Sequence, residues 1–488
     1  MLHYTGHPLV DVGIATIAAF AGKPDPTTLT EGDLDAAADY MEANYLVDPL
    51  KSFLTVAFPN SGFTQPAYEK QPEKRMIYAR RLLRAYRAGT PTLDVACAFT
   101  GEPAANVSLD VKEELARGRA FRQHIPLLTG EGYVNFYPYG DAGLPVSGKV
   151  LLCLQALPLG CAKVAGRLLA VHADDPSLTY RFARHFLERN RQAIQTAQQA
   201  GDKKMPEYPR RPGTLVVEIL LALEEERQRT AEEGVASSVT AYHLTNSGQG
   251  AALDIYQLPL EIGEFLRVVM TPRYRASWDA LRTRGWEVSL AKRPRDTNAE
   301  TFVPRYNVLY EDLFRLPEEA ALFIRRYFLR VPVRSVKPGD PRATYSIRGD
   351  VALISWDLTE LFLRKVVRMN QNRIDNIREL GDALAAHVNA ENDRGFFHAF
   401  LTARRYDNLR AALIRASVAR IKRGQPPLVG FDQYLRIFEE GEDLPYSDWR
   451  LAKDLVLIRM IEQLHRMGWI QKHAEELPEP EIEEQETA

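Results

Sequence analysis

Residues 237–259 read SSVTAYHLTNSGQGAALDIYQLP, and this stretch decides the fold class. Apolar and polar residues alternate in both of its halves, and β-branched and aromatic residues are frequent, as is typical of strands. Asn246, Ser247 and Gly248 form a turn signal between the halves. We therefore expect a β-hairpin with strands at Val239–Leu244 and Leu253–Leu258, in a chain whose other periodic segments are helical.

The chain after the hairpin is dominated by helical periodicity. Phe302–Val333 shows it around two prolines, and from Leu353 onward it is nearly continuous. The later segments have the lengths and short connections of an antiparallel helical bundle. We expect its helices at Leu358–Met369, Ile374–Asn392, Arg394–Arg423, Phe431–Glu439 and Ser447–Met467.

The chain before the hairpin is also mostly helical by pattern. A short apolar helix should end at Gly22, Thr30 is placed to cap a helix over 31–45, and residues 151–200 look mostly helical. The sequence thus predicts an α+β, predominantly helical fold. We expect a mixed N-terminal domain with the β-hairpin at 1–350, a C-terminal antiparallel helical bundle at 351–473 and an acidic disordered tail at 474–488.

Charge is distributed unevenly although the formal net charge is only −2. Glu264–Arg348 has 17 Lys/Arg against 10 Asp/Glu, a net of +7, and Leu361–His473 has 19 against 14, a net of +5. The tail has seven Glu and no Lys or Arg. An acidic tail of this kind is either a solubilising end or a segment that keeps a basic surface from non-specific binding.

Targeting and redox signals indicate a cytoplasmic protein. Three cysteines are too few for a disulfide framework and suit a reducing compartment. No run of about 18 apolar residues occurs, and the N-terminus lacks the pattern of a secretory signal. We expect neither a membrane protein nor a secreted one.

Sequence signatures of catalysis are missing. There is no P-loop, no HExxH and no GxSxG motif, and the His3/His7 pair is interpreted as structural. We therefore expect no catalytic residue, no metal and no cofactor, while an active site assembled from distant residues stays open as an alternative.

Four segments occur in an order that resembles a known family. They are YTGHPLVDVGIA at 4–15, CAFTGEPA at 97–104, LQALPLG at 154–160 and the stretch Ala241–Pro259. The order, the chain length and the helical C-terminus together resemble the large-subunit family of type I-B CRISPR surveillance complexes (Cascade), in its Cst branch.

The resemblance implies a non-catalytic subunit near the 5′ end of a guide RNA. Such a subunit recognises the short motif that flanks the target in duplex DNA, stabilises the R-loop and recruits a separate helicase-nuclease for antiviral defence. Its implied partners are the guide RNA, target DNA, the Cascade backbone subunits and small subunits. The latter can arise from an internal start, here near Met369, which would give a product of residues 369 to 488.

One departure from the family concerns zinc. Members of this branch often carry two CxxC pairs, but Cys97 and Cys153 are each the remaining half of a pair. Because structural zinc takes four Cys or His ligands, we predict no zinc and interpret both residues as small buried hydrophobes.

Candidate nucleic-acid contacts fall into a turn and three groups of cations. Amides at the hairpin tip could read base edges, although an ordinary polar turn explains them as well. The cations could neutralise phosphates, with Tyr208 stacking on a base, or they could be solvated charges. The turn residues are Asn246, Ser247 and Gln249. The cations lie on a basic helix over Lys74–Ala88 (Arg80, Arg84, Arg87), in a linker (Lys203, Lys204, Arg210, Arg211) and on one long bundle helix (Arg404, Arg405, Arg410, Arg415, Arg420, Lys422, Arg423).

The long bundle helix has its own expected core face, formed by Phe396, Phe400, Leu409, Leu413, Ile414 and Ile421. Three other functions stay open beside the Cascade subunit. They are the equivalent subunit of a CRISPR-guided transposon, a nuclease with a non-obvious site, and a helical scaffold that binds no nucleic acid.

Overall fold

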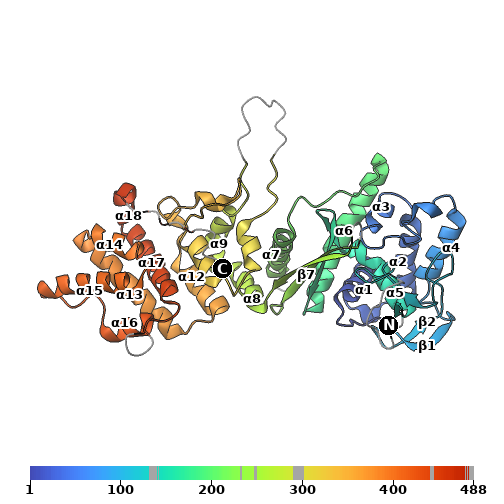
Figure 1. Cartoon of the computed structure of the whole chain (residues 1–488), viewed down its shortest axis with the longest axis horizontal. Coiled ribbons are helices and arrows are strands. Elements are labelled where there is room, and N and C mark those ends of the chain that lie inside the picture. The colour runs from blue at the N-terminus through green and yellow to red at the C-terminus, as the bar shows by residue number, and fades with distance from the viewer. Residues whose placement is uncertain are drawn as a thin grey trace, which may run out of the picture. The chain divides into compact units, whose positions relative to one another are not determined.

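The chain divides into two compact units, Met1–Leu260 and Glu261–Ala488. The computed structural model describes residues 1–130, 140, 142–230, 234–246, 250–289, 302–439 and 444–476, and also 478, 480 and 482. Figure 1 shows helices throughout both units and a small antiparallel sheet in the first, so the expected α+β, predominantly helical fold is confirmed.

The first unit is built around a four-stranded antiparallel sheet in the order β5-β6-β7-β8. The expected hairpin is confirmed as β7 (Val239–Thr245) and β8 (Ala252–Leu258). β5 (Ala162–Val164) and β6 (Arg167–Ala173) extend it, although 151–200 was expected to be mostly helical. β6 is an almost fully buried apolar run, a pattern that periodicity does not separate from a buried helix.

The described part of this unit contains seven α-helices. Two small sheets join them, one of β1 (Thr92–Ala96) with β2 (Pro103–Ala105), the other of β3 (Arg119–Ala120) with β4 (Leu144–Pro145). The helices are α1 (Pro8–Ala21), α2 (Glu31–Asn44), α3 (Leu50–Leu54), α4 (Pro72–Leu83), α5 (Gly148–Ala156), α6 (Pro176–Ala200) and α7 (Pro212–Thr230). Gly22 ends α1 in the left-handed conformation, and Thr30 caps α2, as expected.

The core of this unit forms where α1 crosses α5 and the turn after it. A Cβ atom on Gly13 would lie 2.1 Å from the carbonyl oxygen of Cys153, and one on Gly160 would lie 1.9 Å from Thr16 Oγ1. The ring of His7 lies edge-on to Phe99 with centroids 4.9 Å apart. The first two segments that carry the family resemblance therefore meet through His7 and Phe99, while Gly13 and Gly160 of the first and third segments pack against residues just outside the other segment.

The second unit begins in a helical layer that continues into the C-terminal helices. Phe362 of α12 stacks on Phe323 of α11 with ring centroids 5.1 Å apart and meets Phe265 of α8 edge-on at 5.5 Å. The structural division therefore lies at residue 260, ninety residues before the expected one, because these contacts join the helices on both sides of residue 350. The helices are α8 (Leu260–Val269), α9 (Pro272–Thr283), α10 (Val308–Leu313), α11 (Ala320–Phe323), α12 (Trp356–Phe362), α13 (Gln371–Glu391), α14 (Arg394–Leu401), α15 (Tyr406–Lys422), α16 (Phe431–Phe438), α17 (Trp449–Arg466) and α18 (Trp469–His473).

The predicted long helix Arg394–Arg423 is wrong, because the structure breaks it into α14 and α15. The break is stabilised by Lys453 of α17, whose buried ammonium group donates to the carbonyl oxygens of Ala403 (3.1 Å) and Leu401 (3.4 Å). A cation at the C-terminal end of a helix satisfies carbonyls that have no partner within the helix. Burial lowers the pKa of Lys453.

The bundle is antiparallel only in part. Arg373 at the start of α13 binds Asp448 beside the start of α17 (2.8 Å), and Arg459 binds Asp382 near the middle of both helices (2.6 Å). Trp469 Nε1 donates to Asn392 Oδ1 (3.0 Å) beyond the far ends. These contacts show that α13 and α17 run in the same direction.

Most of the predicted tail at 474–488 lies outside the described residues, so its disorder stays a prediction. Ala474–Glu476 form a 3₁₀ turn, and Ile482 is fully buried. The backbone N–H of Ile482 donates to Pro332 (3.0 Å), and its carbonyl accepts from Arg334 (2.9 Å). Across the described parts of the chain, every helix is too short or too polar to cross a membrane.

Candidate nucleic-acid interface

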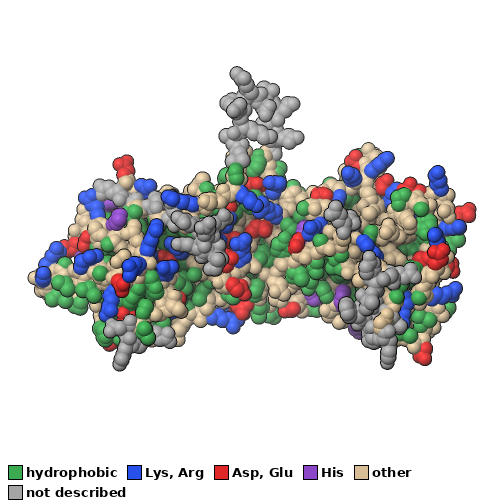
Figure 2. Space-filling view, viewed as in Figure 1, with side chains coloured by type: hydrophobic (Ala, Val, Ile, Leu, Met, Phe, Trp, Pro, Cys, Tyr) green, Lys and Arg blue, Asp and Glu red, His purple; other side chains and the backbone are tan. Residues whose placement is uncertain are grey.

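Charge on the molecular surface is mixed. On the face drawn in Figure 2, Lys and Arg side chains are interspersed with Asp and Glu over both units. A cationic site therefore requires Lys or Arg side chains that form no ion pair with a neighbouring Asp or Glu.

The predicted cationic linker is a packed segment held at several points. Met205 and Tyr208 are buried. Ser52 Oγ donates to the carbonyl of Lys203 (2.7 Å), and Lys163 of β5 donates to that of Met205 (3.2 Å). The backbone N–H of Tyr208 in turn donates to Lys163 (2.9 Å). The backbone that carries Lys203 and Lys204 is thus fixed by its neighbours.

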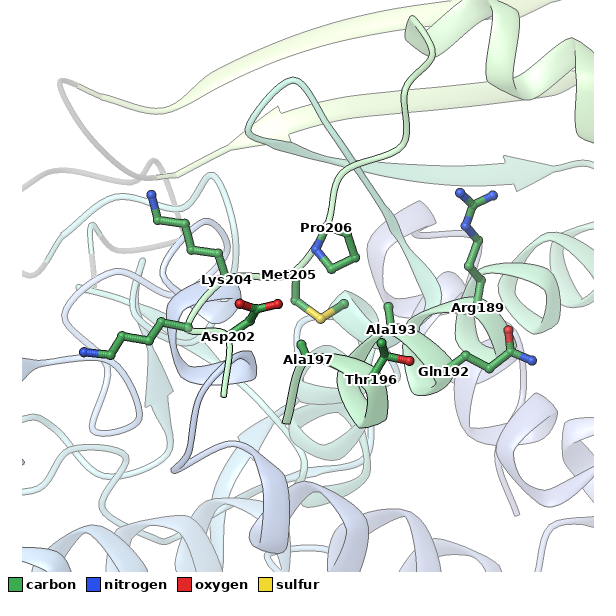
Figure 3. Close-up of a pocket in the computed structure, with 10 residues that line it drawn as sticks. Arg189, Gln192, Ala193, Thr196, Ala197, Asp202, Lys204, Met205 and Pro206 are labelled. Atoms are coloured by element: carbon green, nitrogen blue, oxygen red, sulfur yellow. The ribbon is translucent and has the colours of Figure 1, made fainter. Parts of the chain in front are cut away.

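An open pocket of about 790 Å³ lies between this linker and the second half of α6. Lys203 and Lys204 are exposed, and neither forms an ion pair within the described chain. Figure 3 shows Lys204 extending on one side of the pocket, Arg189 on the other and Asp202 between them. Three cations against one carboxylate leave the lining with a net charge of +2. The lining residues are Arg189, Gln192, Ala193, Thr196, Ala197, Asp202, Lys203, Lys204, Met205 and Pro206.

Arg189 joins this site although the sequence analysis missed it. Its guanidinium lies 4.0 Å from the ring centroid of Tyr208, which also meets Phe186 edge-on at 5.8 Å. Burial raises the pKa of Tyr208 to about 12. The ring of Tyr208 is therefore already covered by side chains of the protein, and the expectation that it stacks on a base is wrong.

A second hollow of about 450 Å³ lies on the neighbouring side of α6 and shares Gln192 with the first. Half of its other polar side chains are carboxamides (Asn44, Gln195 and Gln198), which both donate and accept hydrogen bonds as base edges require. Arg191 lies over the rings of Phe20 (5.0 Å) and Tyr40 (5.5 Å). The lining residues are Tyr40, Asn44, Glu188, Arg191, Gln192, Ile194, Gln195 and Gln198.

The remaining linker cations lie at the start of α7. Arg210 Nε donates to Glu218 (2.8 Å), so this guanidinium is partly neutralised, and Arg211 is exposed. Neither residue lines the two hollows.

The cations predicted on the basic helix face carboxylates of α2. The helix α4 ends at Leu83, before the predicted end at Ala88, so Arg84 and Arg87 lie beyond its last turn. Arg84 bridges the carboxylates of Asp35, Asp39 and Glu42. Arg87 pairs with Asp35 (2.8 Å), and Arg80 lies 3.8 Å from Glu42. Burial lowers the pKa of Arg84, but the carboxylates, led by Glu42, raise it overall.

These contacts make the group of Arg80, Arg84 and Arg87 an ion-pair network between two helices of one unit. The signal for it was in the sequence, because Asp35, Asp39 and Glu42 have the spacing of one helical face.

Asn246 is an anchor of the sheet and is nearly fully buried. Its backbone N–H donates to Val56 (2.8 Å), and its side-chain amide donates to Arg122 (2.8 Å) and Ala57 (3.3 Å). Arg122 in turn donates to the carbonyl of Asn246 (2.8 Å). The prediction that this amide reads a base edge is wrong, since it binds the protein interior. Ser247 and Gln249 lie outside the described residues.

The cations predicted on one long bundle helix lie partly in the break between α14 and α15 and partly on α15. Arg404 and Arg405 precede α15, and Arg405 lies 3.6 Å from Asp407. Arg423 pairs with Glu391, and Arg420 donates to the carbonyl of Pro426 (3.1 Å). Arg410, Arg415 and Lys422 are on α15, and the last two are exposed without an ion pair among the described residues.

The three cysteines are buried thiols. Burial strongly raises the pKa of Cys153 and of Cys161, so both are protonated at neutral pH. The described part of the chain brings together no group of three or more His, Cys, Asp or Glu that could hold a metal ion.

Comparisons with known proteins provide no relative for this arrangement. No family model, curated protein or solved structure matches the chain.

Proposed function

We propose that this chain is a non-catalytic, nucleic-acid-binding subunit of a larger assembly. The observation that carries the proposal is the pocket beside α6, where Lys203, Lys204 and Arg189 surround a hollow next to a second hollow lined by amides. Phosphates of a single strand would lie on the cations, and bases would face the amides of Gln192 and Gln195. Binding of this type is dominated by charge and tolerates many sequences.

We further propose that the assembly is a type I-B CRISPR surveillance complex, in which the chain is the large subunit. This second step rests on the four segments that resemble that family. It adds a guide RNA, a target DNA and a recruited helicase-nuclease as partners. Recognition of the flanking motif would then fall to residues other than Asn246, whose amide is used inside the fold.

A salt titration of nucleic-acid affinity tests the first step. We expect a fluorescent single-stranded oligonucleotide to bind with an affinity that falls steeply with ionic strength. Replacing Lys203 and Lys204 together by Ala removes two phosphate contacts, so the slope of log K against log salt should shrink by about 1.4.

A matched control is the double replacement Lys112→Ala/Arg117→Ala. These two cations are also exposed in the first unit, but they lie outside both hollows. The control should keep the slope of the unmodified chain. Equal slopes for all three proteins would contradict the site, and affinity that ignores salt would favour a scaffold without nucleic acid.

Co-purification with the products of neighbouring genes tests the second step. A guide RNA and backbone subunits should be retained by the tagged chain, whereas neighbouring transposition genes would favour the transposon alternative. Incubation of the purified chain with DNA and divalent metal addresses the nuclease alternative, which robust cleavage would support.

An internal start near Met369 remains part of this proposal. Met369 lies between a π-turn that ends at Val367 and α13, which Asn370 caps. A product of 369–488 would therefore begin at the start of a helix. Expression with a C-terminal tag should give a second, shorter band, and a single band would count against the internal start.

A further inference from the structure

Helix α15 exposes a row of aliphatic side chains. Ile414, Val418 and Ile421 are 52%, 43% and 55% exposed, and their spacing of four and three residues places them on one helical face. The sequence analysis assigned Ile414 and Ile421 to the core, which is wrong. Figure 2 shows hydrophobic side chains gathered over the region of α15 and α16 that Figure 1 labels.

Another face of α15 packs against the core of the bundle. Leu409, Ala412, Leu413 and Ala416 are buried, so the aliphatic row is additional to the residues that pack α15 onto its unit. An exposed row of large aliphatic side chains is unusual on a soluble surface, and clustered examples mark sites where another protein binds.

Cations border this row along one side. Arg415 and Lys422 each follow an exposed isoleucine by one residue, which places them about 100° around the helix from it. Both are exposed and have no ion pair among the residues that the structure describes. The surface thus combines an apolar strip with a positive border, and its complement is an apolar strip with a negative border.

We propose that this face of α15 binds an amphipathic helix of another protein, whose apolar edge is bordered by Asp or Glu. A helix laid along the row would cover the aliphatic side chains, and its carboxylates would meet Arg415 and Lys422. A nucleic-acid strand would meet the cations but would leave the aliphatic row uncovered. Two copies of this chain, joined face to face, would bring the same cations into one interface.

Two synthetic peptides on the full-length chain test the proposal. Both are 21-residue helices with Leu on one edge, bordered by Glu in the first and by Lys in the second. Fluorescence anisotropy at moderate salt should show binding of the Glu peptide, with the Lys peptide at least tenfold weaker. Ile414→Ser/Ile421→Ser should weaken the Glu peptide at least tenfold.

A charge reversal provides the sharper result. Arg415→Glu/Lys422→Glu should weaken the Glu peptide and strengthen the Lys peptide, so that the preference inverts. Ile77→Ser is the matched control for an exposed isoleucine, because Ile77 lies on α4 and is 60% exposed. It should leave binding unchanged, and circular dichroism should give the same helix content for all variants.

Three outcomes would overturn the proposal. The first is an affinity for the Glu peptide that neither double variant changes. The second is displacement of the peptide by single-stranded DNA together with insensitivity to Ile414→Ser/Ile421→Ser, which would make this a phosphate-binding face. The third is a dimer in sedimentation that Ile414→Ser/Ile421→Ser dissociates, which would assign the row to a second copy. None of these depends on the pocket beside α6, so either site can fail alone.

Discussion

His124 is a fully buried imidazole of the first unit with both ring nitrogens engaged. The backbone N–H of Phe121 donates to Nδ1 (3.1 Å), and Nε2 meets the carbonyl of Leu109. This pair of partners suits the neutral ring with its proton on Nε2. Burial lowers the pKa of His124 from its ordinary value to about 4, and the Leu109 carbonyl offsets only part of that effect.

This depressed pKa predicts a loss of stability in mild acid. Between pH 6.5 and 4 the unfolded chain binds a proton at His124 that the folded chain does not, so stability falls as pH falls through that window. The full difference between the two pKa values corresponds to about 3 kcal/mol of unfolding free energy. Urea denaturation at a series of pH values should show this loss.

The variant His124→Gln keeps one acceptor and one donor but cannot titrate. Its free energy of unfolding should therefore vary less between pH 6.5 and 4 than that of the unmodified chain. Parallel pH profiles for the two proteins would rule out His124 as the source of the dependence.

Single residues also set the limit of the site prediction. Lys203 and Lys204 are neighbours in the sequence and remain exposed beside one pocket in the fold, while their role as phosphate contacts stays a prediction. Arg189 was missed because helix packing alone brings it to the same pocket. Asn246 has the residue type expected in a base-reading turn, and only the fold shows that it is buried and that its amide nitrogen donates to two backbone carbonyls of the protein.

Close helix packing makes certain glycines indispensable at the scale of elements. Gly13 in α1 faces the backbone of α5, where a methyl group would lie 2.1 Å from the carbonyl oxygen of Cys153. Backbone yields less readily than a flexible side chain, so the helices would have to separate. We expect Gly13→Ala to cost about 1–3 kcal/mol of unfolding free energy.

Gly32 of α2 is the matched control for that substitution. A Cβ there meets only Thr30 Oγ1, at 3.7 Å. Gly32→Ala should stabilise the chain by about 0.5–1 kcal/mol, because alanine loses less backbone entropy in a helix. Thermal denaturation should separate the two variants in opposite directions, and a shared direction would contradict the close crossing.

Elements with local signals were predicted well, and those that depend on distant partners were not. The hairpin has alternation and a turn within 23 residues, and α2 has its cap beside it. The break between α14 and α15 depends on Lys453, some fifty residues further along the chain. No periodicity in Arg394–Arg423 could have revealed that break.

The acidic tail bears on the charge of the whole molecule, and its residue Ile482 is buried and hydrogen-bonded to Pro332 and Arg334. Ending the chain after Glu476 removes five Glu, so the formal net charge rises from −2 to +3. We expect about tenfold tighter non-specific DNA binding at low salt, since net charge governs such association. An electrophoretic shift assay measures it.

Neutralising the same five positions with glutamine separates charge from anchoring. This variant keeps Ile482 and should bind DNA as tightly as the truncated chain. DNA affinity that both variants leave unchanged would assign the tail a solubilising role only. The replaced residues are Glu479, Glu481, Glu483, Glu484 and Glu486.

The domain division could not be predicted for a reason that also lies at this scale. The sequence places a boundary at residue 350, yet Phe265 and Phe323 on one side of it meet Phe362 on the other in space. The composition of a segment can predict that it is a loop. Whether that loop lies between two domains depends on contacts between residues that are distant in the sequence.

The parallel pairing of α13 with α17 has a consequence for synthesis on the ribosome. α13 is complete at Glu391, but the partner that covers it ends at Arg466. At roughly 5–20 residues per second, the nascent helix waits about 4–15 s with its apolar side uncovered. We therefore expect chaperones to engage the growing polypeptide while residues 392–466 are being made.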